Sequence, residues 1–241
     1  MGTAVTINVR NDSSTLHNFF FFQQPAVFPG VQGVYTDSLF MQALLPYASS
    51  GAILTFSIST QIYAGVQQRL NTLVFGARSG ELTASQPIEL TPAAGQPAKN
   101  TTTMIVSPSL GLSAPVPTSG PPVGGFRIVT PVFDPVLNNY NGGLAIRAKA
   151  GSIVLSSFVT VQPNINLDCQ PALKFYVQTG SYPAGTVIDF GSASRTAALC
   201  DATPGYSTFE VVYHLDGTWT VRPYAAVRSV PGESPPPKSV N

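Results

Sequence analysis

Few residues in this chain have the types and spacing that chemistry requires, and the histidines show this first. His17 and His214 are the only two, so a histidine-based metal site would need both imidazoles and a carboxylate such as Asp168 or Asp201. No ligand spacing such as His-x-Glu-x-His supports such a site. We therefore expect no metal site, and no metal or organic cofactor.

Three side chains remain as candidates for a catalytic role: His214, Asp189 and Arg127. Asp189 stands within the run Val-Ile-Asp-Phe, where its neighbours are expected to be buried, although an edge-strand or turn position would explain it too. Arg127 could meet a buried carboxylate or an anionic ligand, and a solvent-facing position in a strand explains it equally well. His214 has a structural alternative as a cross-strand partner of Trp219.

Several function classes lack the residues or charge that they need. Nucleophile elbows, phosphate-cradling glycine loops and dinucleotide fingerprints are absent, and Gly30-Val-Gln-Gly33 is too short to be one. The 11 acidic residues show no spacing that selects a glycosidase pair. With 12 basic residues the net charge is only +1, too small for the positive field that nucleic-acid binding depends on. Nucleic acid is therefore not an expected partner.

The two cysteines, Cys169 and Cys200, are too few for a disulfide scaffold and are not spaced as a Cys-x-x-Cys site. A possible disulfide between them would stabilise the fold by roughly 3–4 kcal/mol in an oxidising compartment. Two reduced thiols are the alternative, because the chain shows no recognisable signal peptide. No apolar run is long enough for a transmembrane segment. We expect a cytoplasmic protein, or one exported without a recognisable signal peptide.

Aromatic side chains in Gly-, Ser- and Asn-rich loops are the candidates for ligand binding, because tyrosine offers rigid contact area with a polar tip. Each of them could instead bridge core and surface. The candidates are Tyr35, Tyr47, Tyr63, Tyr140, Tyr182 and Trp219.

The elements that must position these residues are strands. Phe19 to Phe22 are four consecutive phenylalanines, and alternation along a strand points them to both faces, so each face needs apolar cover. The 22 Pro, 21 Gly and scarce charges disfavour helices. We expect an all-β protein: a single two-sheet antiparallel sandwich, jelly-roll-like, with at most one short helix.

Local patterns place the elements. Val5, Ile7 and Val9 alternate as a first strand, which the turn residues 11–14 would join to the phenylalanine strand as a hairpin. A half-buried strand is predicted from residue 54, and further strands near 72–77, 101–107, 125–131, 144–149, 151–162, 172–179, 186–190 and 206–222. Asp37-Ser38 could cap the one short helix, over 39–45.

The C-terminal hairpin carries the clearest turn signal. Asp216-Gly217 suits a two-residue type I′ turn, which would pair His214 with Trp219 and place both on one face with Val212.

Residues 1–228 are expected to form one β-sandwich domain with a long Pro/Gly-rich loop at 107–124. The Pro-rich tail, 229–241, is expected to be disordered.

Three segments in the C-terminal third resemble known proteins: Gln162-Pro-Asn164, Gly180-Ser-Tyr-Pro-Ala-Gly185 and Asp216-Gly-Thr-Trp-Thr-Val221. Together with the N-terminal Ile-Asn-Val-Arg and the phenylalanine run that follows it, they are similar in kind and order to segments of the RhiA-type, or rhizosphere-induced, bacterial proteins. The resemblance covers about half of the chain and leaves out 64–124 and the cysteines. It implies a compact β protein and assigns no catalytic residue.

Two function classes fit these expectations. In the first, the chain is a non-enzymatic module that binds a carbohydrate or a protein through its Tyr-, Asn- and Gly-rich loops, or assembles as a homo-oligomer, which its near-zero net charge favours. In the second, it is a cofactor-independent cyclase or isomerase that holds a small hydrophobic molecule in an apolar pocket between the sheets. A closed, phenylalanine-lined cavity would favour the enzyme. A filled interior with tyrosine-lined surface grooves would favour the binding protein.

Overall fold

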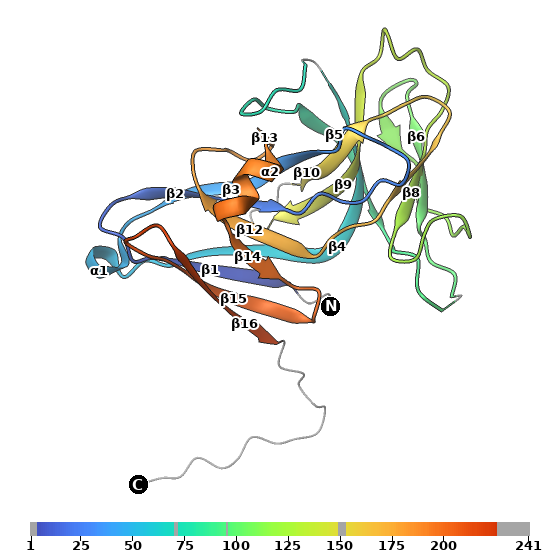
Figure 1. The fold of residues 1–241 in the computed structure, drawn as a ribbon. Coiled ribbons are helices and arrows are strands. Elements are labelled where there is room, and N and C mark those ends of the chain that lie inside the picture. Colours follow the sequence, from blue (N-terminus) through green and yellow to red (C-terminus); the bar gives the residue numbers. More distant parts are fainter. Residues whose placement is uncertain (1–3, 70–71, 95, 149–152, 226–241) are drawn as a thin grey trace.

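The computed structural model describes residues 4–69, 72–94, 96–148 and 153–225 (Figure 1). Strands make up 51% and helices 5% of them, so the prediction of an all-β protein is confirmed. The predicted disordered tail, 229–241, lies outside the described residues. None of the described helices is long and apolar enough to cross a membrane.

The strands form three sheets, of four, nine and four strands. The first two share β3, so hydrogen bonding continues from one into the other in the order β14-β12-β2-β3-β10-β9-β4-β1-β15-β16, with β13 beside β3 and β5 beside β4. The strands of these two sheets are β1 (Val5–Asn11), β2 (His17–Gln23), β3 (Tyr35–Leu44), β4 (Leu54–Gln68), β5 (Glu81–Ile88), β9 (Tyr140–Ala148), β10 (Ile153–Thr160), β12 (Lys174–Thr179), β13 (Val187–Ile188), β14 (Ala198–Asp201), β15 (Tyr206–Tyr213) and β16 (Trp219–Ala225).

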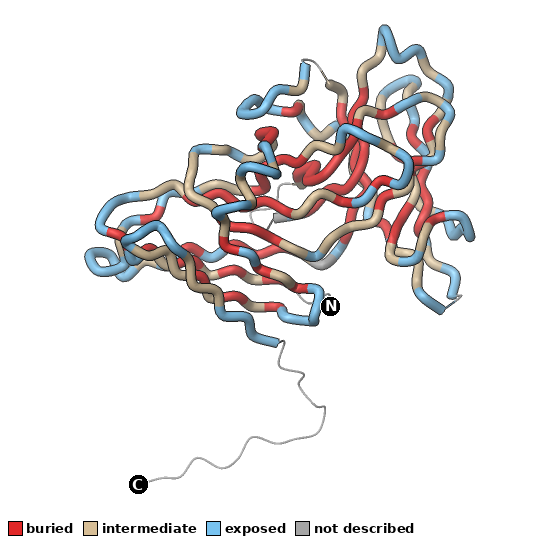
Figure 2. Tube along the Cα trace, viewed as in Figure 1, coloured by how far each residue is buried: buried red, intermediate tan, exposed pale blue. Residues whose placement is uncertain are grey.

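The remaining four strands form a smaller sheet, in the order β11-β8-β6-β7, at one end of the molecule (Figure 1). They are β6 (Thr101–Ile105), β7 (Gly111–Leu112), β8 (Phe126–Val129) and β11 (Asn166–Cys169). Buried residues of this sheet, such as Met104 and Phe126, belong to the same apolar cluster as Val66 of β4. Buried residues lie along the centre of the molecule, and exposed loops surround them (Figure 2).

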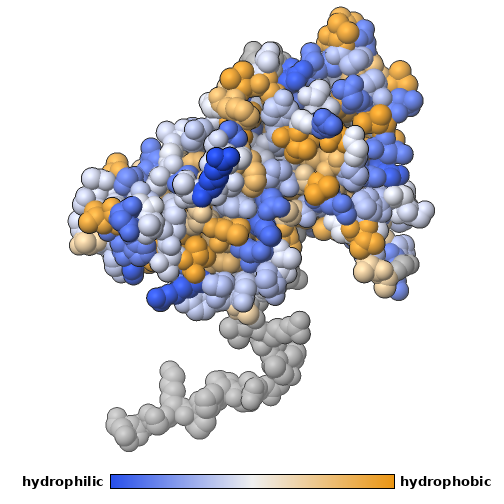
Figure 3. Space-filling model, viewed as in Figure 1, coloured by the Kyte–Doolittle hydropathy of each residue, from blue (hydrophilic) through white to orange (hydrophobic). Residues whose placement is uncertain are grey.

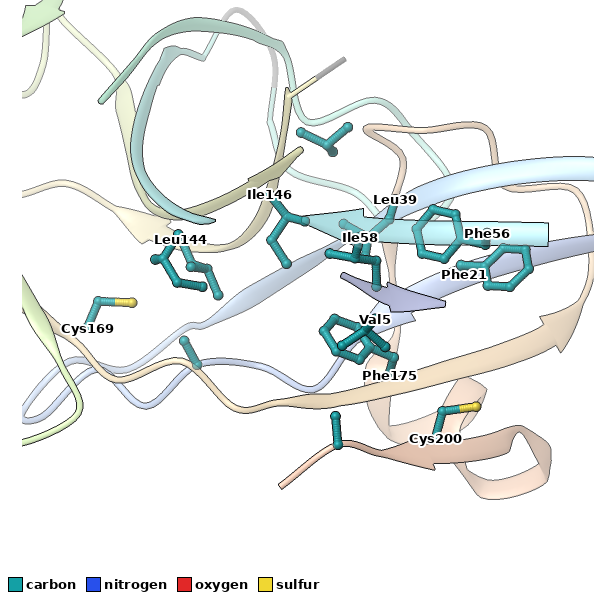
Figure 4. Packing of buried hydrophobic residues seen from close by; sticks show 14 of the residues in the cluster. Val5, Phe21, Leu39, Phe56, Ile58, Leu144, Ile146, Cys169, Phe175 and Cys200 are labelled. Atoms are coloured by element: carbon teal, nitrogen blue, oxygen red, sulfur yellow. The ribbon is translucent and has the colours of Figure 1, made fainter. Parts of the chain in front are cut away.

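The phenylalanine run is buried on both faces, as predicted: all four rings are at most 1% exposed. Phe19 and Phe21 face the main core, where Phe21 stacks on Phe56 of β4 with ring centroids 4.4 Å apart (Figure 4). Phe20 and Phe22 face the other way, into a second cluster with Tyr176 and Ile188. This second face is covered by Tyr182, Ile188 and the segment around Phe190 and Ala193 rather than by a second sheet.

The helices are two one-turn α-helices, α1 (Tyr47–Ser50) and α2 (Phe190–Ala193), and a 3-10 turn, η1 (Ser194–Thr196). The prediction of at most one helix, over 39–45, is therefore wrong. Those residues lie in and just after β3, where Ser38 pairs with Phe22 of β2 and Asp37 pairs with Val187 of β13. Pairing with strands distant in sequence overrides the local capping signal.

The sheets depart from the single two-sheet antiparallel sandwich in number and in strand direction. β1 runs parallel to β15 and β6 runs parallel to β8. β1 and β2 do not form the predicted hairpin, because β1 lies between β4 and β15 while β2 lies between β12 and β3. The side chain of Asn11 fixes this crossover, accepting from the Ser13 hydroxyl at 2.6 Å and donating to the carbonyls of Thr15 and Leu44 at 2.9 and 3.0 Å.

Two further segments differ from prediction. Residues 72–77 form no strand: 72–74 are irregular and a turn follows at 75–76. The proline-rich stretch 107–124 is not wholly a loop, because it contains β7 and a bridge that joins Val116 to Thr101.

The C-terminal hairpin exists, but its register is shifted by one residue. The loop between His214 and Thr218 has three residues, and Gly217 alone takes a positive φ, of 82°, where a type I′ turn needs two such residues. Tyr213 therefore pairs with Trp219. Because a one-residue slip reverses the faces, His214 lies on the opposite side from Trp219.

Candidate functional site

Two of the residues selected from the sequence, Tyr182 and Asp189, line a surface groove with a volume of about 470 Å³. We call it the α2 groove, since α2 and η1 form one wall; β2, β12, β13, the loop between β12 and β13 and the segment 74–80 supply the other lining residues. Its lining is Phe20, Phe75, Gly76, Gln178, Thr179, Tyr182, Ile188, Asp189, Ser192, Ala193 and Thr196.

Aromatic rings form the base of the α2 groove. Tyr182 lies on Phe20, with ring centroids 4.7 Å apart and the planes at 49°. Phe20 in turn stacks on Phe22, and Phe22 meets Phe190 of α2 edge to face. The outer face of the phenylalanine run thus forms the base of the groove, held in place by packed aromatic neighbours.

Phe75 contributes an exposed ring to the same groove, with 61% of its surface open to solvent. Its segment is held against β13, because Gly76 N donates to Val187 O at 2.8 Å and Val187 N donates to Ala77 O at 2.8 Å. A large aromatic side chain held open by a fixed backbone is a frequent element of ligand-binding surfaces.

Polar groups on the wall of the α2 groove are ordered by hydrogen bonds. Asp189 caps α2, accepting from the Ser192 hydroxyl at 2.6 Å and from its backbone N–H at 3.3 Å. These bonds hold the pKa of the exposed Asp189 carboxyl below its usual range, so the group is charged at neutral pH. Gln178 is fixed as well, since its amide nitrogen donates to the Thr196 hydroxyl at 2.7 Å.

Of the residues selected from the sequence, only Tyr182 and Asp189 meet in this groove. Tyr47 and His214 share another pocket, of about 290 Å³, where Arg10 lies over the Tyr47 ring at 5.2 Å. Tyr35 lines a third, near Gly30 and Gly33.

The other selected aromatic residues serve the core. Tyr63 and Tyr140 are 7% and 5% exposed. Trp219 packs on Tyr213 and Phe19, and its indole nitrogen donates to the Thr196 carbonyl at 2.8 Å. The predicted stacking of His214 on Trp219 is therefore wrong; the His214 ring instead lies 2.8 Å from the Thr220 hydroxyl.

Arg127 meets a carboxylate, one of the alternatives drawn from the sequence. It pairs with Asp168 directly across β8 and β11, with Nε–Oδ1 at 2.6 Å and Nη2–Oδ2 at 2.8 Å. Nη2 also donates to Gly120 O at 3.0 Å. This bidentate pair raises the pKa of Arg127 and links the proline-rich stretch to the small sheet, a structural role.

The possible disulfide is not formed: Cys169 and Cys200 are both free and buried. They lie at opposite ends of the apolar cluster (Figure 4), one in β11 and the other in β14. Among the described residues, no three His, Cys, Asp or Glu side chains are grouped as a metal site would need.

A fourth pocket, of about 240 Å³, contains a buried acid that the sequence patterns did not reveal. Asp37, 1% exposed, accepts from the Ser79 hydroxyl at 2.5 Å through Oδ2. Burial raises its pKa to about 7. In the sequence, Asp37 and Ser38 together have the composition of a helix cap. That Asp37 is a buried carboxyl becomes clear only from its position in β3.

Comparison of the chain with protein families, with curated proteins and with solved structures found no match. The similarity to RhiA-type proteins thus stays a prediction, and the function rests on the geometry of the chain itself.

Proposed function

We propose that the protein is a non-enzymatic binding protein and that the α2 groove recognises a carbohydrate. The observation that carries this proposal is the combination, in one groove, of two accessible aromatic rings with a charged carboxylate and a fixed amide. Phe75 and Tyr182 supply the rings and Asp189 supplies the carboxylate, whereas the Gln178 amide is bonded to Ala193, Thr196 and Thr179 and holds the wall of the groove in place.

This combination suits a sugar because a sugar has two kinds of surface. Its ring carbons present an apolar C–H face, which packs on an aromatic side chain, and its rim carries hydroxyls. A carboxylate has about four lone-pair sites, and Ser192 occupies two of those on Asp189. Asp189 therefore retains the capacity to accept from sugar hydroxyls, in bonds strengthened by its charge.

A protein partner is the other occupant that the binding hypothesis allows. The face in view in Figure 3 carries hydrophobic residues in separate patches among hydrophilic ones. Protein interfaces have apolar cores, so this mosaic favours a small polar ligand over a large protein contact.

The geometry gives less support to the cyclase or isomerase. Phe19 to Phe22 are each at most 1% exposed. Their rings are therefore packed against other side chains and do not line a cavity between the sheets. His214, Asp189 and Arg127 lie respectively in the C-terminal hairpin, the α2 groove and the small sheet, and do not converge on one substrate.

The proposal can be tested by titrating a panel of soluble oligosaccharides into the full chain and measuring heat. We expect at least one to bind, and we expect Phe75→Ala and Asp189→Asn each to weaken that binding by about tenfold or more, a loss of about 1.4 kcal/mol. The matched control is Leu137→Ala, which truncates a side chain that is 77% exposed elsewhere. Binding unaffected by both groove variants, or no binding to any sugar, would exclude the α2 groove as a carbohydrate site.

A further inference from the structure

The 240 Å³ pocket holds buried polar atoms that have no partner in the described part of the chain. Its lining includes Asp37 of β3 and Gln67 of β4, each 1% exposed. Among the described residues, Oδ1 of Asp37 and Nε2 of Gln67 have no hydrogen-bond partner. Leaving such an atom buried and unpaired costs about 1–3 kcal/mol, more if the group is charged, so both atoms call for an explanation.

The two atoms are complementary in kind. Asp37 Oδ1 as a carboxylate oxygen accepts a hydrogen bond, whereas Gln67 Nε2 donates one. The pocket lining also contains one positive and one negative side chain, those of Arg78 and Glu81. A metal ion fits this set poorly, since an amide donor and a guanidinium would face it alongside the carboxylates.

The walls between these polar groups are apolar. Leu82, Ile153, Val154, Leu155 and Ala184 supply them. A volume of about 240 Å³ is below the roughly 300–1,000 Å³ of sites for drug-sized ligands, so the occupant is small.

The segment 78–80 lies against the pocket, and Arg78 and Gly80 are among its lining residues. Arg78 bridges to Thr186, and Ser79 joins the segment to Asp37 through its hydroxyl and to Gly185 through its N–H at 2.9 Å. Gly80 has a φ of 141°, and a Cβ there would lie 3.2 Å from Gln67 Nε2. The absence of a side chain at Gly80 therefore leaves room next to the unpaired amide.

We propose that this pocket binds a small zwitterion, of the class of an α-amino acid with a short apolar side chain. Its ammonium group donates to Asp37 Oδ1, and its carboxylate accepts from Gln67 Nε2 and meets the Arg78 guanidinium. Both bonds are charge-assisted. The side chain lies against Leu82 and Leu155. This site is separate from the α2 groove and does not depend on its function.

The charges of the ligand also predict that protons are released when it binds. The ammonium group keeps its proton, and Asp37 must be ionised to receive it, so protein that holds a proton on Asp37 releases it to the buffer on binding. Since the pKa of Asp37 is about 7, affinity for the zwitterion should rise from pH 6 to pH 8. Arg78 and Glu81 are the other charged groups that line the pocket.

The test uses L-alanine and two probes that each differ from it by one group. In L-lactate a hydroxyl replaces the ammonium, and in isopropylamine a methyl replaces the carboxylate. Calorimetric titration of the full chain should show L-alanine binding at least about tenfold tighter than either of the others. Titration at pH 7 in two buffers of different ionisation enthalpy should show proton release. L-Lactate binding as tightly as L-alanine would overturn the proposal.

Variants assign the binding to the pocket. Asp37→Asn keeps the shape and should reduce L-alanine affinity by about tenfold or more and abolish its pH dependence, and Gln67→Met should weaken it independently. Asp134→Asn, the same change on an exposed loop residue, is the matched control. Retained binding in Asp37→Asn would overturn the proposal. So would the failure of all three probes to bind, which would leave ordered water as the partner of the buried atoms.

Discussion

The ring of Tyr182 rests on the ring of Phe20, with centroids 4.7 Å apart, and so joins the hydrophobic core to the α2 groove. Phe20 comes from the phenylalanine run that fills the centre of the fold, and Tyr182 from the loop between β12 and β13. The base of the proposed sugar site is thus supported by core packing, which keeps a contact surface in place before a ligand arrives.

Removing the Tyr182 ring should therefore lower affinity without unfolding the protein. We expect Tyr182→Ala to weaken carbohydrate binding by about tenfold or more, because the apolar face of the sugar loses its platform. Tyr182→Phe keeps the ring and should retain most of the affinity. Calorimetric titration of both variants checks this, and equal losses in the two would assign the effect to the hydroxyl instead.

A different effect is expected at Phe21, because its ring packs in the main hydrophobic core and does not line the α2 groove. It is fully buried between Phe40 and Phe56, with centroids 6.0 and 4.4 Å away. Phe21→Ala should lower the free energy of unfolding by about 3–5 kcal/mol, through lost burial and the cavity left behind. Urea denaturation measures this change. Leu215→Ala, at a site 73% exposed, should stay within about 0.5 kcal/mol of the wild type; similar losses in both would contradict the assignment of Phe21 to the core.

The phenylalanine run also marks how far the sequence could predict the fold. Alternation required cover on both faces, and the structure provides it. Which element covers each face depends on contacts between distant segments, so the short helix α2 and the loop of Tyr182 over Phe20 and Phe22 were not predictable from local pattern. The same limit applies to the hairpin, where Asp216-Gly217 located the turn but a three-residue loop moved Trp219 opposite Tyr213.

The Arg127–Asp168 pair should stabilise the small sheet. The two side chains are 18% and 19% exposed, between the fully exposed and fully buried cases. We expect Asp168→Asn to lower the free energy of unfolding by roughly 1–2 kcal/mol, above the value of an exposed pair because the guanidinium loses its charged partner while most of its surface is shielded from water.

Gly120→Ala perturbs the same pair sterically, because a Cβ at that position would clash with Nη1 of Arg127. A double-mutant cycle with Asp168→Asn, followed by urea denaturation, should show non-additive losses. Strict additivity would mean that Gly120 acts independently of the ion pair.

Asp37 gives the stability of the protein a distinct pH dependence. Its folded pKa, about 7, lies above the ordinary carboxyl value of 3.8, so the folded state holds the proton more tightly than the unfolded state. The stability contribution of that proton is complete below pH 4 and is lost as pH rises to about 7. Asp37→Asn mimics the protonated acid, so its stability relative to the wild type should rise between pH 4 and 7 and level off above. Urea denaturation across this range checks the trend, and a flat difference would contradict the buried carboxyl.

The cysteines should resist thiol reagents in the folded protein. Burial raises the pKa of Cys200 to about 12 and raises that of Cys169 as well, so few thiolates form at neutral pH. We expect both thiols to react slowly with a chromogenic disulfide reagent until denaturant is added, and then to react fully. Intact mass after non-reducing denaturation should correspond to two thiols; the mass of a disulfide would contradict the separation of β11 and β14.

The candidate sites were only partly predictable. Tyr182 and Asp189 drew attention because an aromatic residue in a glycine-rich loop and an acid in an apolar run are uncommon combinations. Phe75 and Gln178 gave no such signal, since their role depends on where 74–80 and β12 lie in space. Asp37 was concealed by its neighbour Ser38, because the two together have the composition of a helix cap.

The most direct test of carbohydrate recognition by the α2 groove is an NMR titration of isotope-labelled protein with the tightest-binding oligosaccharide of the panel. Binding in the groove should shift the backbone amides of Gly76, Gln178 and Ser192 in a saturable manner, and leave those of the pocket around Tyr47 and His214 unchanged. Saturable shifts confined to that other pocket, or none at all, would contradict the assignment of the groove.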